Sequence, residues 1–128
     1  MKGWQWLWIA FLGLTATVLG ALAAHGATDL SLAQQASLAT AVRYQQGYAL
    51  LLLCLMPLEW LTKQQWRWVF GLWSLGIVAF SGSIYMLITT SWHWLWPVTP
   101  IGGGLLMLGW VALGITGWHC AKGFNQPA

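Results

Sequence analysis

The stretch WQWLWIAFLGLTATVLGALAA, residues 4–24, decides the fold of this chain because it contains no charged side chain. A helix needs about 20 mostly apolar residues to cross the hydrocarbon core of a bilayer, and this stretch is long enough. Over all 128 residues, 59% are hydrophobic and 5% are charged, whereas soluble domains average about 25% charged residues. The sequence therefore predicts an integral membrane protein.

Three further apolar runs, 44–61, 66–88 and 100–120, have lengths similar to the first. Together the four runs predict an all-α fold, a four-helix transmembrane bundle. No low-complexity tract or convincing internal repeat divides the chain, so residues 1–128 are expected to form a single integral membrane domain.

The segment that joins the first two runs is polar and is expected to contain a short helix. Ser31 and Gln34 have the spacing of a capping box, in which each side chain bonds the backbone N–H of the other residue. A single helix from Ser31 to the end of the second run would be longer than the hydrocarbon core is thick. We therefore expect an interfacial helix over residues 31–43, with a break near residues 45–47.

The distribution of Lys and Arg predicts the orientation of the chain. Positive residues near span ends favour the cytoplasmic side, and an N-in, C-in topology leaves only Arg43 outside. Trp residues cluster beside the predicted span ends, as they do in the aromatic belts of membrane proteins. The basic residues expected on the cytoplasmic side are Lys2, Lys63, Arg67 and Lys122.

The first run has an alternative interpretation as a signal peptide. Lys2 precedes it, and the small residues ALA occupy positions 21–23. However, its apolar stretch of about 20 residues is longer than the 7–15 of a typical signal peptide. We expect the span to be retained.

Small residues along one face of the first, third and fourth runs are expected to allow close helix packing, because lipid tails give helices no hydrophobic reason to associate. A tight monomeric bundle is the main expectation, and a homodimer contact through one such face is the alternative. The glycines expected in these contacts are Gly13, Gly20, Gly82, Gly102 and Gly109.

Polar residues from distant parts of the chain are predicted to gather in the outer half of the membrane. With four spans, the ends of the first and third runs and the starts of the second and fourth lie at the same side. Unpaired polar groups at that depth cost several kcal/mol, so we expect His25 to pair with Tyr44, Gln45 or Ser83. The group forms either interhelical hydrogen bonds or a small ligand or ion site. This candidate polar pocket contains His25, Tyr44, Gln45, Tyr48, Ser81, Ser83, Tyr85 and Thr99.

No pattern in the sequence indicates catalysis. Asp29 and Glu59 are predicted at opposite faces of the membrane, so they form no carboxylate pair for acid–base chemistry. The three histidines do not follow a metal-ligand spacing, although a haem held by His25 and His93 is an alternative. No basic stripe suits nucleic acid. The expectation is a protein without catalytic residues, metal or cofactor, and therefore not an enzyme.

Four motifs, taken in order and spacing, resemble a known family. They are GALAAHGA (20–27), RYQQGYALLL (43–52), FSGSIYML (80–87) and VTPIGGGLLMLGW (98–110). The chain is similar over about residues 10–117 to domain-of-unknown-function family 423, small multi-span bacterial inner-membrane proteins related to the animal transmembrane protein 256. The resemblance implies a location in the bacterial inner membrane, a retained first span and a compact four-helix membrane protein, but no mechanism. Members typically carry YQxxH, and Tyr48 stands in the place of that histidine here, which favours a hydrogen-bonding role.

These observations lead to one main expectation about function and two alternatives. The main one is a non-enzymatic membrane protein that acts as an accessory subunit of a larger membrane complex. The first alternative is a small transporter, channel component or lipid binder that uses the outer pocket around His25, and the second is a haem-binding subunit. The expected partners are membrane lipids and other membrane subunits or a second copy of the chain.

Overall fold

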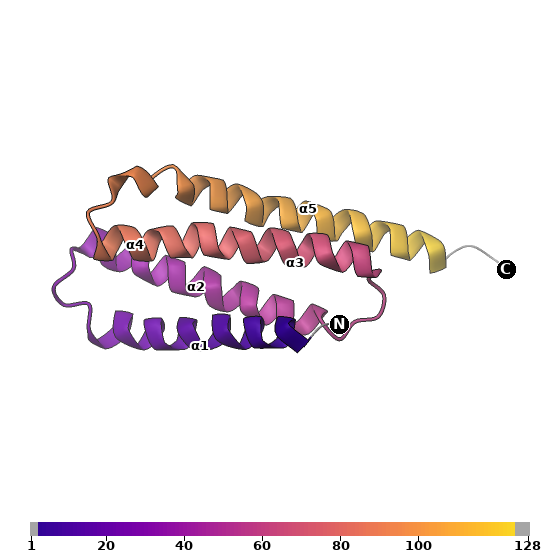
Figure 1. The fold of residues 1–128 in the computed structure, drawn as a ribbon, viewed down its shortest axis with the longest axis horizontal. Coiled ribbons are helices and arrows are strands. Elements are labelled where there is room, and N and C mark those ends of the chain that lie inside the picture. Colours follow the sequence, from indigo (N-terminus) through magenta and orange to yellow (C-terminus); the bar gives the residue numbers. More distant parts are fainter. Residues whose placement is uncertain (1–2, 125–128) are drawn as a thin grey trace.

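Four helical stretches lie side by side in the computed structural model, which describes residues 3–124. Figure 1 shows α1 and α5 at opposite edges, with α2, α3 and α4 between them. The main contacts join α1 to α2 and α3 to α5. α1 begins and α5 ends at the same end of the bundle (Figure 1). The helices are α1 (Gly3–His25), α2 (Leu32–Leu55), α3 (Lys63–Ile77), α4 (Ser83–Thr89) and α5 (Val98–Phe124).

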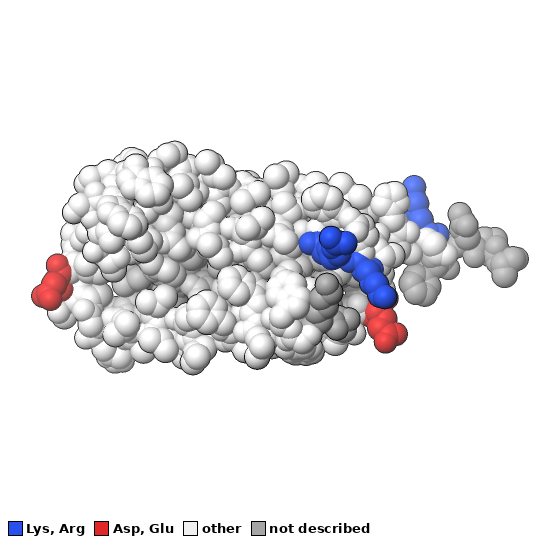
Figure 2. All heavy atoms as spheres, in the orientation of Figure 1, with Lys and Arg blue, Asp and Glu red and all other residues white. Residues whose placement is uncertain are grey.

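Three helical stretches are long and apolar enough to cross a membrane: Gly3–His25, Lys63–Thr89 and His93–Gly123. α2 has 24 residues, about as many as α1, but its first half carries several polar side chains. Figure 2 shows a wide band without charged residues along the middle of one face, with Lys, Arg, Asp and Glu toward the ends. The length and surface of the molecule are those of a membrane protein.

The predicted break in the second helix is wrong, because α2 runs unbroken through residues 45–47. The polar side chain of Gln45 bonds to a neighbouring helix and leaves the backbone ladder of α2 intact. The helix ends at Leu55, six residues before the predicted end of the span. Pro57 explains this end, since proline cannot donate the backbone hydrogen bond that continues a helix.

The predicted capping box at the start of α2 is confirmed. The Ser31 hydroxyl accepts from the Gln34 backbone N–H at 3.2 Å, and Gln34 Oε1 accepts from the Ser31 N–H at 3.0 Å. A second capping box, which we did not predict, starts α3: Thr62 and Gln65 exchange the same two bonds at 3.3 and 3.0 Å. The third helix therefore begins at Lys63 instead of residue 66.

A π-helical turn, Val78–Gly82 (η1), joins α3 to α4 within one continuous helical stretch. The chain then passes through a short 3₁₀ turn, His93–Leu95 (η2), into α5. The predicted third run is thus a single stretch with one irregular turn, where we expected a regular helix.

The bundle interior is filled by side chains. Trp73, Leu52 and Val69 are fully buried, and Met56 and Leu106 are almost so. Two glycines of α5 permit this packing. A methyl group on Gly109 would overlap the Trp73 indole, and one on Gly102 would overlap the backbone of Phe80.

The other glycines predicted in helix contacts are placed differently. A methyl group on Gly20 would lie 3.3 Å from Val42 Cγ1, so this glycine does face α2. A methyl group added to Gly13 or to Gly82 would have no neighbouring atom within 4 Å, so neither glycine is needed for a close helix contact. Close approach therefore concentrates along α5, on the side that meets α3 and η1.

Candidate functional site

A buried amide, that of Gln45, joins three helices. Gln45 Nε2 donates to the Leu12 carbonyl oxygen of α1 at 2.9 Å and to Thr15 Oγ1 at 2.7 Å. The Tyr85 hydroxyl of α4 donates to Gln45 Oε1 at 2.8 Å. Both ends of the amide are thus satisfied inside the bundle, which avoids the cost of an unpaired buried polar group.

The π-helical turn adds further links between helices. The hydroxyl of Ser81, which is almost fully buried, donates to the Ala41 carbonyl oxygen of α2 at 2.8 Å. Ser83 and Thr99 share a hydrogen bond of 2.6 Å between their hydroxyl oxygens, which ties α4 to the first turn of α5. π-helical turns occur frequently at functional sites, and this one places Ser81 against α2, while Ser83, the first residue after the turn, meets α5.

Two tyrosines of α2 complete the predicted group. The Tyr48 hydroxyl accepts from Trp110 Nε1 at 2.9 Å, and its ring lies edge-on to Trp73 at a centroid distance of 5.3 Å. Tyr44 is partly exposed and its ring lies 4.9 Å from that of Phe80. Tyr48, for which we expected a hydrogen-bonding role, is therefore bonded to α5.

His25 lies apart from this group. It is exposed at the last residue of α1, and within residues 3–124 it makes no hydrogen bond to Tyr44, Gln45 or Ser83. The partner of Gln45 on α1 is Thr15, ten residues or about 15 Å of helix before His25. The structure brings together Gln45 with Tyr85 and Ser83 with Thr99, and it leaves the histidine at the end of the bundle.

Prediction missed several partners in this network. The acceptors for Gln45 and Ser81 are backbone carbonyl oxygens, which carry no residue-specific signal in a sequence. Thr15 and Trp110 had a signal that we did not use. Each is a hydrogen-bonding residue within an apolar run, where an unpaired polar group is costly.

Metal ligands do not cluster in the described structure. Within residues 3–124, no group of three or more His, Cys, Asp or Glu side chains is placed to hold a metal ion.

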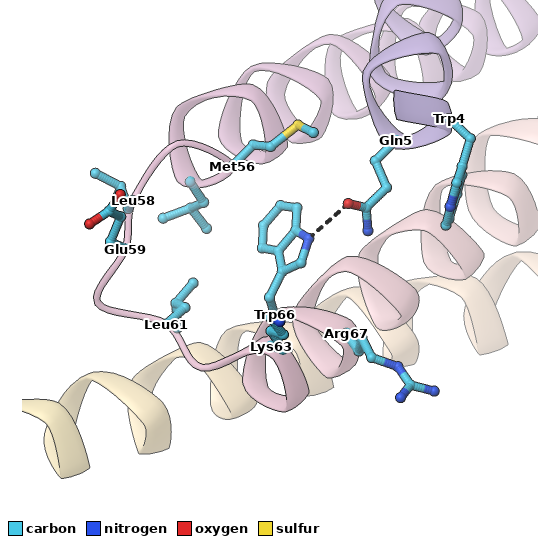
Figure 3. A pocket seen from close by; sticks show the side chains of 10 residues that line it. Trp4, Gln5, Met56, Leu58, Glu59, Leu61, Lys63, Trp66 and Arg67 are labelled. Atoms are coloured by element: carbon cyan, nitrogen blue, oxygen red, sulfur yellow. Dashed lines mark hydrogen bonds between the residues drawn. The ribbon is translucent and has the colours of Figure 1, made fainter. Parts of the chain in front are cut away.

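A groove of about 710 Å³ opens at the end of the bundle where α1 begins (Figure 3). The indole of Trp66 stands at its centre and donates from Nε1 to Gln5 Oε1 at 3.3 Å. We call it the bundle-end groove. It is lined by Trp4, Gln5, Leu55, Met56, Leu58, Glu59, Leu61, Lys63, Trp66 and Arg67.

A second groove, of about 430 Å³, runs between α1 and α2 in the middle of the bundle, and we call it the α1–α2 groove. The small residues Gly13 and Thr17 leave the α1 wall of this groove open. The exposed side chain of Gln46 enters it from α2 and makes no hydrogen bond within residues 3–124. The remaining lining residues are Trp6, Ile9, Ala10, Ala49, Leu50 and Leu53.

Comparison with known proteins gives a consistent result. Residues 19–103 match the family described as "Protein of unknown function (DUF423)". The chain is 32% identical over 106 residues to a UPF0382 membrane protein of Haemophilus influenzae, which covers 82% of this chain and 86% of the relative. It is 36% identical over 105 residues to the UPF0382 membrane protein SSP2132 of Staphylococcus saprophyticus, which covers 81% and 88%. No solved structure matches the chain.

Proposed function

Because the chain belongs to the DUF423 family of membrane proteins of unknown function, we propose that it is a non-enzymatic accessory subunit of a complex in the bacterial inner membrane. In this proposal the chain crosses the membrane four times, with both termini in the cytoplasm, and a helix of another membrane subunit occupies the α1–α2 groove.

The position of α2 supports four crossings. Its 24 residues span about 36 Å, and it lies against α1 along the bundle (Figure 1). The polar side chain of Gln45 points inward and is hydrogen-bonded, so this part of α2 does not expose it to lipid. A helix of modest mean hydropathy can cross a bilayer when its polar groups are satisfied in this way.

The positions of basic residues support the orientation. Lys63 begins α3 and Lys122 lies in the last turn of α5, at the end of the bundle where α1 begins (Figure 1). The positive-inside rule favours the cytoplasm for this end.

The observation that carries the proposal is the exposed amide of Gln46 in the α1–α2 groove. A polar side chain that faces lipid at this level without a hydrogen bond is costly, and a helix with its own polar side chain would satisfy it. Gly13 and Thr17 permit that helix to approach closely, since small residues let backbones come together in membranes. The filled interior of the bundle favours this role over conduction through a single chain.

In-cell photo-crosslinking tests the proposal. A photoreactive amino acid replaces Leu50, an exposed residue of the α1–α2 groove, and separately Met107, equally exposed on α5. We expect position 50 to form a discrete adduct with another membrane protein, position 107 to form none, and Gln46→Leu to abolish the adduct. An adduct of twice the chain's mass would show that the partner in the groove is a second copy of this chain and not a different subunit. Equal labelling at both positions, or labelling that does not depend on Gln46, would contradict the proposal.

A further inference from the structure

A third groove, of about 450 Å³, runs along the surface between α1 and α3. We call it the α1–α3 groove. It shares Trp4, Gln5 and Arg67 with the bundle-end groove, so the two adjoin at these residues. One continuous depression therefore leads from the end of the bundle onto its apolar flank. The other residues that line the α1–α3 groove are Trp8, Phe70, Gly71, Ser74 and Leu75.

Two positive charges line this depression: Arg67 stands where the grooves meet, and Lys63 lines the bundle-end groove. Lys63 and Arg67 are exposed and lie four residues apart on α3, the spacing that places two side chains on the same helix face. Like charges at this spacing repel each other. Within residues 3–124, neither takes part in an ion pair, and Figure 3 shows Glu59 on the opposite edge of the groove from Arg67. An anion between the two side chains would relieve the repulsion.

The walls beyond these charges suit a hydrocarbon chain. Phe70 and Leu75 are apolar, and Gly71 leaves open space where another residue would place a side chain. The two polar groups in the wall satisfy each other, because Trp8 Nε1 donates to Ser74 Oγ at 3.0 Å. Neither Trp8 nor Ser74 therefore offers a polar ligand an unpaired hydrogen-bonding group.

In the orientation proposed above, on which this inference rests, the end of the bundle that carries these grooves faces the cytoplasmic membrane surface. Trp4 and Trp66 stand near the ends of α1 and α3, and indole rings mark the membrane–water interface. Basic pockets between transmembrane helices on the cytoplasmic side bind the phosphates of anionic lipids. We propose that this composite groove binds an anionic phospholipid, with its phosphate between Lys63 and Arg67 and one acyl chain along Phe70, Gly71 and Leu75.

Native mass spectrometry of the purified chain with added phosphatidylglycerol or phosphatidylcholine tests the charge part of the proposal. We expect phosphatidylglycerol to be retained in preference to phosphatidylcholine. The Lys63→Gln/Arg67→Gln double variant should lose about thirtyfold in phosphatidylglycerol affinity, given the usual contribution of a basic residue near an anionic surface. The matched control Arg43→Gln also removes an exposed positive charge, but from outside these grooves, and should bind like the wild type.

Two results would overturn the proposal: equal retention of phosphatidylcholine, or an equal loss of affinity in Arg43→Gln. Inorganic phosphate without lipid serves to separate a headgroup site from a free-phosphate site. We expect it neither to raise the melting temperature in detergent nor to displace bound phosphatidylglycerol, and displacement would show a site for phosphate rather than for a lipid.

The acyl-chain part has its own variant. Gly71→Leu fills the α1–α3 groove, whereas Gly114→Leu adds the same side chain at an exposed glycine of α5 that also has open space around it. We expect Gly71→Leu to reduce phosphatidylglycerol retention and Gly114→Leu to leave it unchanged. Unchanged retention in Gly71→Leu would overturn the placement of the chain. If Gly71→Leu does not fold, a short-chain phosphatidylglycerol tests the acyl-chain contact instead, and we expect it to bind more weakly than the long-chain lipid. The charge variants then test the headgroup contact.

Discussion

The side-chain amide of Gln45 on α2 donates a 2.9 Å hydrogen bond to the backbone carbonyl oxygen of Leu12 on α1. That carbonyl already belongs to the hydrogen-bond ladder of its own helix, so the contact attaches one side chain directly to another helix's backbone. The oxygen of the same amide accepts a hydrogen bond from the hydroxyl of Tyr85. A single buried side chain thus fixes the relative positions of α1, α2 and α4.

Gln45→Leu should lower the free energy of unfolding by about 2 kcal/mol, because three hydrogen bonds of about 0.6 kcal/mol each are lost. Reversible unfolding in mixed detergent micelles measures this change. The matched control is Gln46→Leu, the same substitution one residue later, where the exposed amide makes no hydrogen bond within residues 3–124. Equal destabilisation by both variants would show that the network contributes nothing specific.

Gly109→Ala should destabilise the bundle by about 1–3 kcal/mol, the usual cost of overpacking a core, because the added methyl group overlaps the Trp73 indole. Gly114→Ala on the same helix has open space and should be neutral or slightly stabilising. Both effects are measured by thermal unfolding in detergent.

A double variant checks the cause of the Gly109 effect. Trp73 Nε1 is buried without a hydrogen-bond partner in the described structure, so Trp73→Phe removes volume beside Gly109 without losing a hydrogen bond. Gly109→Ala in the Trp73→Phe background should therefore cost less than it does alone. Strictly additive losses would contradict direct overlap between the two positions.

The parts of the fold that could be predicted are those set by local sequence. The first span was expected over residues 4–24 and α1 covers Gly3–His25, because an uncharged apolar run defines both its ends. The capping box at Ser31 was readable for the same reason. The end of α2 was also readable from Pro57, but the apolar residues around it suggested a longer span.

The parts that could not be predicted depend on what lies across the helix interface. A polar cluster such as YQQGY looks like a helix break when partners are unknown, yet Gln45 is satisfied by α1 and α4 and the helix continues. His25 was misplaced because it lies about 15 Å of helix beyond Thr15, the α1 side chain that Gln45 bonds, and so not at the level of this network. The π-helical turn adds to this problem, since it shifts the facing of every residue after Gly82.

His25→Ala should change the free energy of unfolding by less than about 0.5 kcal/mol, as surface substitutions usually do. The side chain is exposed and makes no hydrogen bond within residues 3–124. Thermal unfolding in detergent measures the effect, with Tyr85→Phe as the contrasting variant because it removes the bond to Gln45. A larger loss of unfolding free energy for His25→Ala than for Tyr85→Phe would show that His25 does contribute to the polar network.

The number of crossings is tested by single cysteines in a background in which the free thiols Cys54 and Cys120 are replaced by serine. Cysteines at Asp29, Gln64, Trp94 and Lys122, all exposed, report the two loops at one end and the two segments at the other. Four crossings from a cytoplasmic N-terminus predict that an impermeant maleimide labels positions 29 and 94 in intact spheroplasts, and positions 64 and 122 only after lysis.

Other labelling patterns would identify which part of the topology is wrong. If α2 lay on the surface and only the three most apolar stretches crossed, positions 29, 64 and 122 would share one side and position 94 the other. The reverse pattern, with 64 and 122 labelled from outside, would keep four crossings and invert the orientation. The four-crossing arrangement is the one that buries the Gln45 amide, already bonded on both its atoms, at a depth where water cannot replace those bonds.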